Sequence, residues 1–178
     1  MNENFARSFL QMFNAIDLCI KNNLVIPSLC LIYSGIDAIA WVAYGNMKVG
    51  KRFEKFVEEH MYKEMPLSPK PIDLYAARCA VLHTMTPDSQ LSDSKKAAPV
   101  VYAWGKAKIE ELDKSINAIR PGELCAVHIA DLSKSFRAGV GHFIENCGDD
   151  IACEERMAKH FSNLGISTVA KFNELEKA

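Results

Sequence analysis

One long apolar segment, from Leu24 to Tyr44, constrains the fold of this chain more than any other feature. It is long and apolar enough for a membrane-spanning helix, but Asp37 lies near its middle and Pro27 near its start. An ionised Asp at the centre of a bilayer costs roughly 2.5–3.5 kcal/mol, whereas Pro is tolerated in the first turn of a helix. We therefore expect Leu24–Tyr44 to form the buried central helix of a globular domain.

The segments around this helix also carry apolar residues at helical spacing. In Asn4–Asn22, for example, Phe5, Phe9 and Ile16 fall on one stripe. Further helices are expected at Lys51–Met61, Ile72–Met85, Lys106–Ile119, Glu123–Asn146 and Ile151–Leu164, with a last short one after Gly165. Val100–Trp104 is a strand-like run, but one strand cannot form a sheet. The pattern predicts an all-α, single-domain bundle of about six to seven helices over residues 1–178.

The composition is that of an ordinary globular protein, with 49% hydrophobic and 24% charged residues. The net charge of −1 argues against a broad basic surface, so we expect neither DNA nor a membrane as a partner. The first residues lack the basic-then-apolar order of a signal peptide, which favours a cytoplasmic location. In that compartment the six cysteines are expected to be reduced thiols.

A short motif, Arg78-Cys-Ala-Val-Leu-His83, carries residue types suited to phosphodiester chemistry. Arg is permanently charged and presents donors to phosphate oxygens, and His exchanges a proton near neutral pH. Such a pair can cleave RNA without a metal ion. Five residues turn an ideal helix by about 140°, so the two side chains should diverge. They are expected to converge only if the helix bends or ends between them, or if a second copy supplies the partner group.

The charge of Arg78 needs a partner from elsewhere in the chain. No acidic residue lies three or four positions away on its own helix. Asp37, within the apolar segment, needs a cation or several donors if it is buried. We therefore expect Asp37 to pair with Arg78, which would fix the guanidinium and leave part of its fork for a phosphate.

A structural explanation of the motif competes with the chemical one. An Arg on a helix is usually solvated, with its stem over apolar neighbours. His83 lies on the apolar face near the end of its predicted helix, where a buried or capping His is common. The spacing also recurs at Arg137-Ala-Gly-Val-Gly-His142, so at least one of the two copies is expected to be accidental.

Two stretches of the sequence belong together: Tyr33-Ser-Gly-Ile-Asp37-Ala-Ile-Ala-Trp41 and Asp73-Leu-Tyr-Ala-Ala-Arg78-Cys-Ala-Val-Leu-His83-Thr84. Together they resemble the HEPN superfamily, whose helical bundles have the signature Arg, four to six residues, then His. The HEPN-like part covers about residues 4–104, and the stretch from about Leu24 to Trp104 also looks like a widespread family of bacterial proteins of similar length. Residues 106–178 would complete or extend the bundle. Cys79 departs from the pattern, because HEPN motifs often have a polar residue after the Arg.

The resemblance implies a metal-independent endoribonuclease of toxin or antiphage-defence type. In that function Arg78 and His83 act on the phosphodiester of RNA, with Asp37 as the supporting acid. The resemblance also implies a homodimer, an antitoxin protein as a partner, and neither cofactor nor metal. Other HEPN-like domains are not catalytic. The alternative is therefore an interaction or scaffold protein in which Asp37, Arg78 and His83 form a structural polar network.

Other candidate sites lie outside this motif. Zinc-binding residue types occur at His142, Cys147, Cys153 and His160, but their spacing matches no known finger. Cys147 and Cys153 can alternatively be a redox pair. A basic cluster is present at Lys48, Lys51, Arg52 and Lys55. We expect it to be a solvated helix face, with the rim of an RNA site as the alternative. Gly139 and Gly141 are expected to permit close helix packing.

Overall fold

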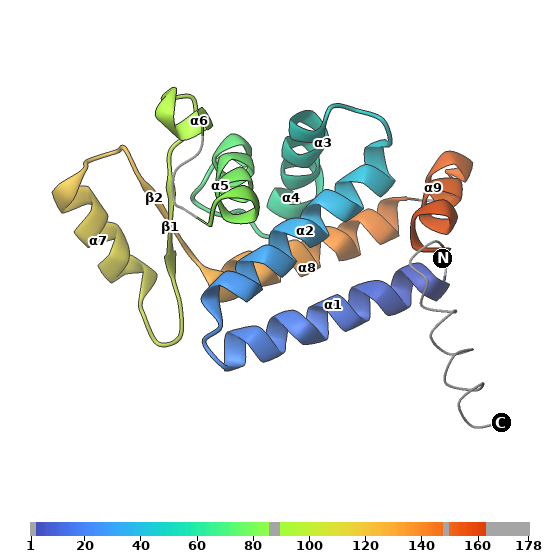
Figure 1. Cartoon of the computed structure of the whole chain (residues 1–178), viewed down its shortest axis with the longest axis horizontal. Helices are drawn as coiled ribbons and strands as arrows, with labels where there is room; N and C mark the ends of the chain where they lie inside the picture. Colours follow the sequence, from blue (N-terminus) through green and yellow to red (C-terminus); the bar gives the residue numbers. More distant parts are fainter. Residues whose placement is uncertain (1–2, 86–89, 148–149, 163–178) are drawn as a thin grey trace.

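The computed structural model describes residues 3–85, 90–147 and 150–162. It is an all-α bundle, as predicted, with a short sheet at one end (Figure 1). The elements are α1 (Glu3–Lys21), α2 (Val25–Tyr44), α3 (Val49–Phe56), the π-helical η1 (Val57–Met61), α4 (Tyr62–Glu64), α5 (Pro71–His83), α6 (Gln90–Asp93), β1 (Val100–Ala103), α7 (Ile109–Ile119), β2 (Cys125–His128), α8 (Ile129–Asn146) and α9 (Ile151–Ser162).

Helix α2 forms the centre of the molecule, because α1, α3, α5, α8 and α9 all pack against it. The sheet lies near its first residues and α9 near its last ones (Figure 1). Gly35 allows α8 to approach, since a Cβ there would lie 2.5 Å from the ring of Phe136. By length and hydropathy α2 could cross a membrane, and half of its most apolar window is buried within the protein.

The predicted helix Lys51–Met61 is interrupted by a π turn. It consists of α3, then η1, and it continues into α4. Segment η1 packs tightly on α8, because a Cβ at Gly139 would lie 3.0 Å from the Cα of Met61. The expected role of Gly139 in close packing is therefore confirmed. The same expectation for Gly141 is wrong, because a Cβ there would meet nothing within 4 Å.

The expectation that no sheet forms is also wrong. Strands β1 and β2 pair in parallel, from Val100 with Cys125 to Ala103 with His128, and α7 forms the connection between them. Residues 125–128 were expected in a helix that began at Glu123, but α8 begins only at Ile129. His128 marks this boundary, because its Nδ1 accepts a hydrogen bond from the backbone N of Ala130 at 3.1 Å.

The start of α5 is fixed by Pro71 and Asp73. Pro suits the first helical position, where its missing N–H costs nothing. The buried carboxylate of Asp73 accepts hydrogen bonds from the backbone N of Lys70 and of Ala98, both at 2.8 Å. Asp73 thus links α5 to the segment before β1. The predicted helix after Gly165 lies outside the described residues.

Candidate functional site

Helices α2 and α5 bring Asp37 and Arg78 together. The Nε of Arg78 donates to Oδ2 of Asp37 at 2.6 Å, and Nη2 lies 2.5 Å from the same oxygen. Both side chains are largely buried, with exposed fractions of 16% for Arg78 and 17% for Asp37. The contact expected from the sequence is present, and it orients the guanidinium from behind.

Arg78 and His83 meet within a single copy of the chain. The Nη1 of Arg78 lies 3.0 Å from Nε2 of His83, although both residues belong to α5. The expectation that convergence needs a bent helix or a second copy is therefore wrong. His83 lies one helical turn beyond Cys79, and the Arg78 side chain passes Cys79, with Nη1 3.9 Å from its Sγ. Arg78 is long enough to reach His83 along this path.

The contact with Arg78 determines which ring nitrogen of His83 carries the proton. Arg has no acceptor atom, so Arg78 must donate and Nε2 of His83 must accept. The imidazole in this arrangement is neutral, with its proton on Nδ1. The side chain of His83 is exposed, unlike those of Asp37 and Arg78. The site therefore presents an imidazole to solvent and keeps its ion pair behind it.

The electrostatics of the pair reflect competing effects. Burial raises the pKa of the Asp37 carboxyl above its ordinary value, and the charge and hydrogen bond of Arg78 act in the opposite direction, as does the charge of Arg52. Burial lowers the pKa of Arg78, but Asp37 outweighs it and the pKa of Arg78 is raised. The guanidinium is therefore charged at any physiological pH, and the carboxylate remains paired at a desolvation cost.

Arg52 on α3 is a second cation near Asp37, and its role was missed from the sequence. Its Nη1 donates to the backbone O of Met47 at 3.1 Å. Within the described residues, Nε of Arg52 and Oδ1 of Asp37 are buried without a hydrogen-bond partner. Such orphaned atoms destabilise a fold and are expected at functional sites more than elsewhere. The sequence signal was Phe56, a buried residue four positions after Arg52 and therefore on the same side of α3.

A cavity of about 550 Å³ lies beside the motif, between the start of α3 and the last turns of α5. Its polar lining residues are Lys48, Lys51, Glu54, Tyr75, Cys79, His83 and Thr84. Gly50 allows the two helices to approach, because a Cβ there would lie 2.9 Å from the ring of Tyr75. Two lysines of the basic cluster therefore line the same cavity as His83.

The second copy of the spacing, Arg137 and His142, is not brought together. The Nη2 of Arg137 donates to Oδ1 of Asp17 at 2.7 Å and to the backbone O of Phe13 at 2.9 Å, both on α1. The Nδ1 of His142 instead lies 2.9 Å from Nδ1 of His60 on η1. This pair of imidazoles was not anticipated from the sequence.

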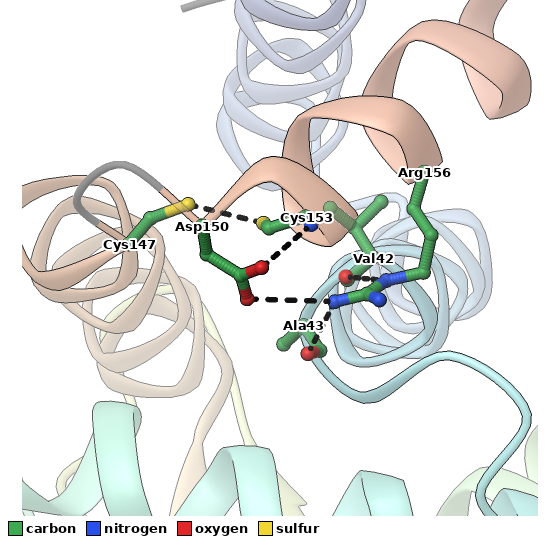
Figure 2. Close-up of polar contacts among 6 residues, drawn as sticks. All are labelled: Val42, Ala43, Cys147, Asp150, Cys153 and Arg156. Atoms are coloured by element: carbon green, nitrogen blue, oxygen red, sulfur yellow. Dashed lines mark hydrogen bonds and ion pairs between the residues drawn. The ribbon is translucent and has the colours of Figure 1, made fainter.

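The zinc hypothesis gains no support from the described residues, which contain no group of three or more His, Cys, Asp or Glu able to hold a metal ion. His142 contacts His60, while Cys147 and Cys153 contact each other (Figure 2). The side chain of His160 lies outside the described part of the chain.

Comparison with known proteins places this chain in no family. No family model, no curated protein and no solved structure matches it.

Proposed function

We propose that this chain is an endoribonuclease of the HEPN type, with Arg78 and His83 acting on the phosphodiester and Asp37 holding Arg78. One observation carries the proposal: a buried carboxylate orients a guanidinium that contacts an exposed imidazole at the edge of a lysine-lined cavity. The resemblance of the two sequence stretches to HEPN proteins supplies the substrate class.

The hydrogen bonds of Arg78 leave donors for a phosphate. Nε and Nη2 contact Asp37, and Nη1 contacts His83. Each terminal nitrogen carries a second N–H, and the second one on Nη1 has only the long contact to Cys79. In the proposed complex these donors bind non-bridging phosphate oxygens and stabilise the charge that grows there. Lys48 and Lys51 contact neighbouring phosphates.

The proposed reaction is an attack by the adjacent 2′-oxygen. Binding of the phosphate draws Nη1 of Arg78 away from His83, and Nε2 then accepts the 2′-hydroxyl proton. A bond forms from the 2′-oxygen to phosphorus as the bond to the 5′-oxygen breaks, and the leaving oxygen takes a proton from water. The products are a 2′,3′-cyclic phosphate and a 5′-hydroxyl. Single-stranded RNA is favoured, because the attacking oxygen must reach an in-line position.

Cleavage of end-labelled single-stranded RNA in the presence of EDTA tests this function. We expect His83→Ala to slow cleavage by about 100-fold or more, the range for loss of a general acid or base. His142→Ala is the matched control, and it should leave cleavage within about threefold of wild type, since His142 lies outside the site. An RNA with a 2′-deoxy residue at the cleaved position should resist. If wild type and His83→Ala leave RNA equally intact, the catalytic proposal is wrong.

Growth of expressing cells adds a second readout. Expression of the wild-type chain should slow growth, and expression of His83→Ala should not. A neutralising antitoxin protein is expected only for a chain that is toxic in this way. Equal growth of cells that express wild type and His83→Ala would show that the toxin and antitoxin part of the proposal is wrong. The result of the RNA cleavage assay would not be affected.

A homodimer is also part of the proposal. Ile26, Met85 and Trp104 have exposed fractions of 40%, 71% and 51% around an apolar cavity of about 290 Å³. Ala80 lines both this cavity and the one that contains His83. The apolar surface therefore adjoins the motif, as a shared active site between two copies requires. Analytical ultracentrifugation should show a dimer for wild type and a monomer for Trp104→Glu.

The alternative is a non-catalytic interaction or scaffold protein in which the same three residues stabilise the fold. The burial of the Asp37–Arg78 pair favours it, since a buried ion pair strongly destabilises a protein when one partner is removed. The two functions differ at His83, whose exposed side chain contributes little to folding. Loss of RNA cleavage in a stable His83→Ala variant supports catalysis. The scaffold function is supported if the wild-type chain leaves RNA intact and Arg78→Ala lowers the free energy of unfolding.

A further inference from the structure

Two cysteines meet where α8 ends and α9 begins. The Sγ of Cys147 lies 3.0 Å from the Sγ of Cys153 (Figure 2). Covalently bonded sulfurs are about 2.05 Å apart, so a shift of about 1 Å would join them. Cys153 is buried and Cys147 is partly exposed, and both are free thiols in this structure. The other cysteines of the described chain have no such sulfur contact.

Local hydrogen bonds hold both sulfurs in place. Cys147 caps the end of α8, and its backbone N donates to the O of Phe143 at 2.7 Å. At the start of α9, the backbone N of Cys153 donates to Oδ1 of Asp150 at 3.2 Å (Figure 2). The backbone N of Glu154 donates to the O of Asp150 at 3.0 Å. The two thiols are therefore positioned by the ends of two different helices.

We propose that Cys147 and Cys153 form a reversible disulfide, so that the junction of α8 and α9 is a site of oxidative modification. The proposal rests on the sulfur–sulfur contact and the helix ends that enforce it, and it is independent of the function proposed for Arg78 and His83.

The oxidant is a low-molecular-weight disulfide, such as oxidised glutathione, and the exchange proceeds in two steps. The thiolate of Cys147, the more accessible sulfur, attacks one sulfur of the small disulfide, and the other sulfur leaves as a thiolate. The thiolate of Cys153 then attacks the sulfur of Cys147 in the mixed disulfide, and the second small thiolate leaves. The two electrons lost by the cysteine pair reduce the small disulfide, and the two thiol protons end on the released thiols.

The environment of Cys153 supports this order. Burial, together with the neighbouring Cys147, raises the pKa of the Cys153 thiol to about 12. A buried thiol of that kind is a poor first nucleophile, because the thiolate is the reactive form. In the mixed disulfide the attacked sulfur is already adjacent, so Cys153 reacts with Cys147 and not with an external reagent.

The disulfide would tighten the attachment of α9 to the rest of the bundle. Helix α9 packs on α1 and α2, and its Arg156 binds the end of α2. The Nε of Arg156 donates to the backbone O of Val42 at 2.6 Å, and Nη2 donates to the O of Ala43 at 3.0 Å (Figure 2). These are carbonyls at the end of α2, where a cation is favourable. Oxidation therefore adds a covalent link between α8 and α9 to the existing contacts of α9 with α1 and α2.

Peptide mapping of the full-length chain tests the proposal. The reduced protein is equilibrated with mixtures of reduced and oxidised glutathione, then alkylated and digested. We expect an intact mass lower by about 2 Da before alkylation and, after cleavage at Asp150 between the two cysteines, a peptide pair joined through Cys147 and Cys153. Limited proteolysis should cut α9 several-fold more slowly after oxidation. Cys147→Ser should abolish both effects, and Cys30→Ser, a matched change on α2, should retain them.

Two outcomes overturn the proposal. One is equal alkylation of Cys147, Cys153 and Cys30 in every glutathione mixture. The other is a linked peptide that joins different cysteines, or a glutathione adduct on Cys147 that persists while Cys153 is present. Cys153 is buried, so a Cys153→Ser change would also disturb packing. The test therefore uses the peptide map of the wild-type chain and does not depend on that variant.

Discussion

The chain contains the spacing Arg, four residues, His twice, and the two copies have opposite outcomes. At Arg78 and His83 the side chains meet at 3.0 Å, while at Arg137 and His142 each side chain contacts a different helix. Both copies lie within single helices, and a small residue follows the Arg in each, Cys79 in one and Ala138 in the other. Spacing and local sequence therefore do not separate them.

The carboxylate that holds each Arg makes the difference. Asp37 on α2 binds Arg78 in a position from which Nη1 still reaches His83. Asp17 on α1 binds Arg137, whose guanidinium also lies 4.7 Å from the ring of Phe13. His142 is then free to contact His60 on η1. Whether the Arg and the His of such a motif meet thus depends on a third residue on another helix.

The largest effect on stability is expected from the two arginines. Arg78→Ala leaves the carboxylate of Asp37 buried without its partner and should cost about 3–5 kcal/mol of unfolding free energy. Arg137→Ala breaks a pair whose side chains are 35% and 61% exposed, so about 1 kcal/mol is expected. Urea denaturation of both variants measures the difference. Equal losses would show that the two ion pairs do not differ in burial as described.

Arg78→Lys sharpens this result. Lys keeps the positive charge near Asp37 but lacks the planar fork that contacts Asp37 and His83 together. We expect it to recover a large part of the stability lost in Arg78→Ala while RNA cleavage stays low. Full cleavage by Arg78→Lys would mean that the fork is unnecessary.

A smaller effect is expected from two glycines within the second copy. Gly139→Ala forces a Cβ to 2.5 Å from Cγ of Met61 and 3.0 Å from its Cα, so we expect a loss of about 1–3 kcal/mol. Gly141→Ala meets no atom within 4 Å and should gain about 0.5–1 kcal/mol from helix propensity. Thermal unfolding of the two variants measures both signs. A stabilising Gly139→Ala would contradict the close packing of η1 on α8.

The smallest effect on stability concerns pH and the imidazole pair. Burial, and next the charge of His142, lowers the pKa of His60 from 6.5 to about 4. Between these pH values the unfolded chain binds more protons than the folded one, so stability falls as pH falls from about 6.5 to 4. Because His60 is partly exposed, we expect a loss of about 1–2 kcal/mol.

Urea denaturation of wild type and His60→Gln at pH 7 and pH 4.5 isolates this effect. His60→Gln should lose less stability than wild type on acidification. An unchanged pH dependence in His60→Gln would contradict the assignment to His60.

The sequence predicted those parts of the fold that depend on local pattern. The stripe of Phe5, Phe9 and Ile16 and the apolar run of α2 gave the correct helices, because helical periodicity is a local property. The pairing of Asp37 with Arg78 was also predictable, since a buried carboxylate requires a cation and Arg78 lacked one on its own helix. That inference used the cost of an unpaired buried charge and needed no knowledge of topology.

The remaining features depend on contacts between distant segments. The short run 125–128 was assigned to a helix, because a few apolar residues fit either periodicity and only pairing with β1 makes them a strand. The contact of His60 with His142 joins residues 82 positions apart, and it depends on the approach of η1 to Gly139. The path of Arg78 to His83 depends on side-chain conformation, which an ideal helical wheel does not describe.

The central place of α2 has a consequence for synthesis of the chain. Helices α1, α3 and α5 can cover it early, but α8 and α9 are made after residue 128. Until then the surface around Gly35 that receives Phe136 is open, and the carbonyls of Val42 and Ala43 lack Arg156. Chains emerge from the ribosome amino end first, and partly covered apolar surface promotes aggregation. The nascent protein therefore carries its most apolar helix incompletely covered, and we expect chaperone dependence to end when α8 emerges.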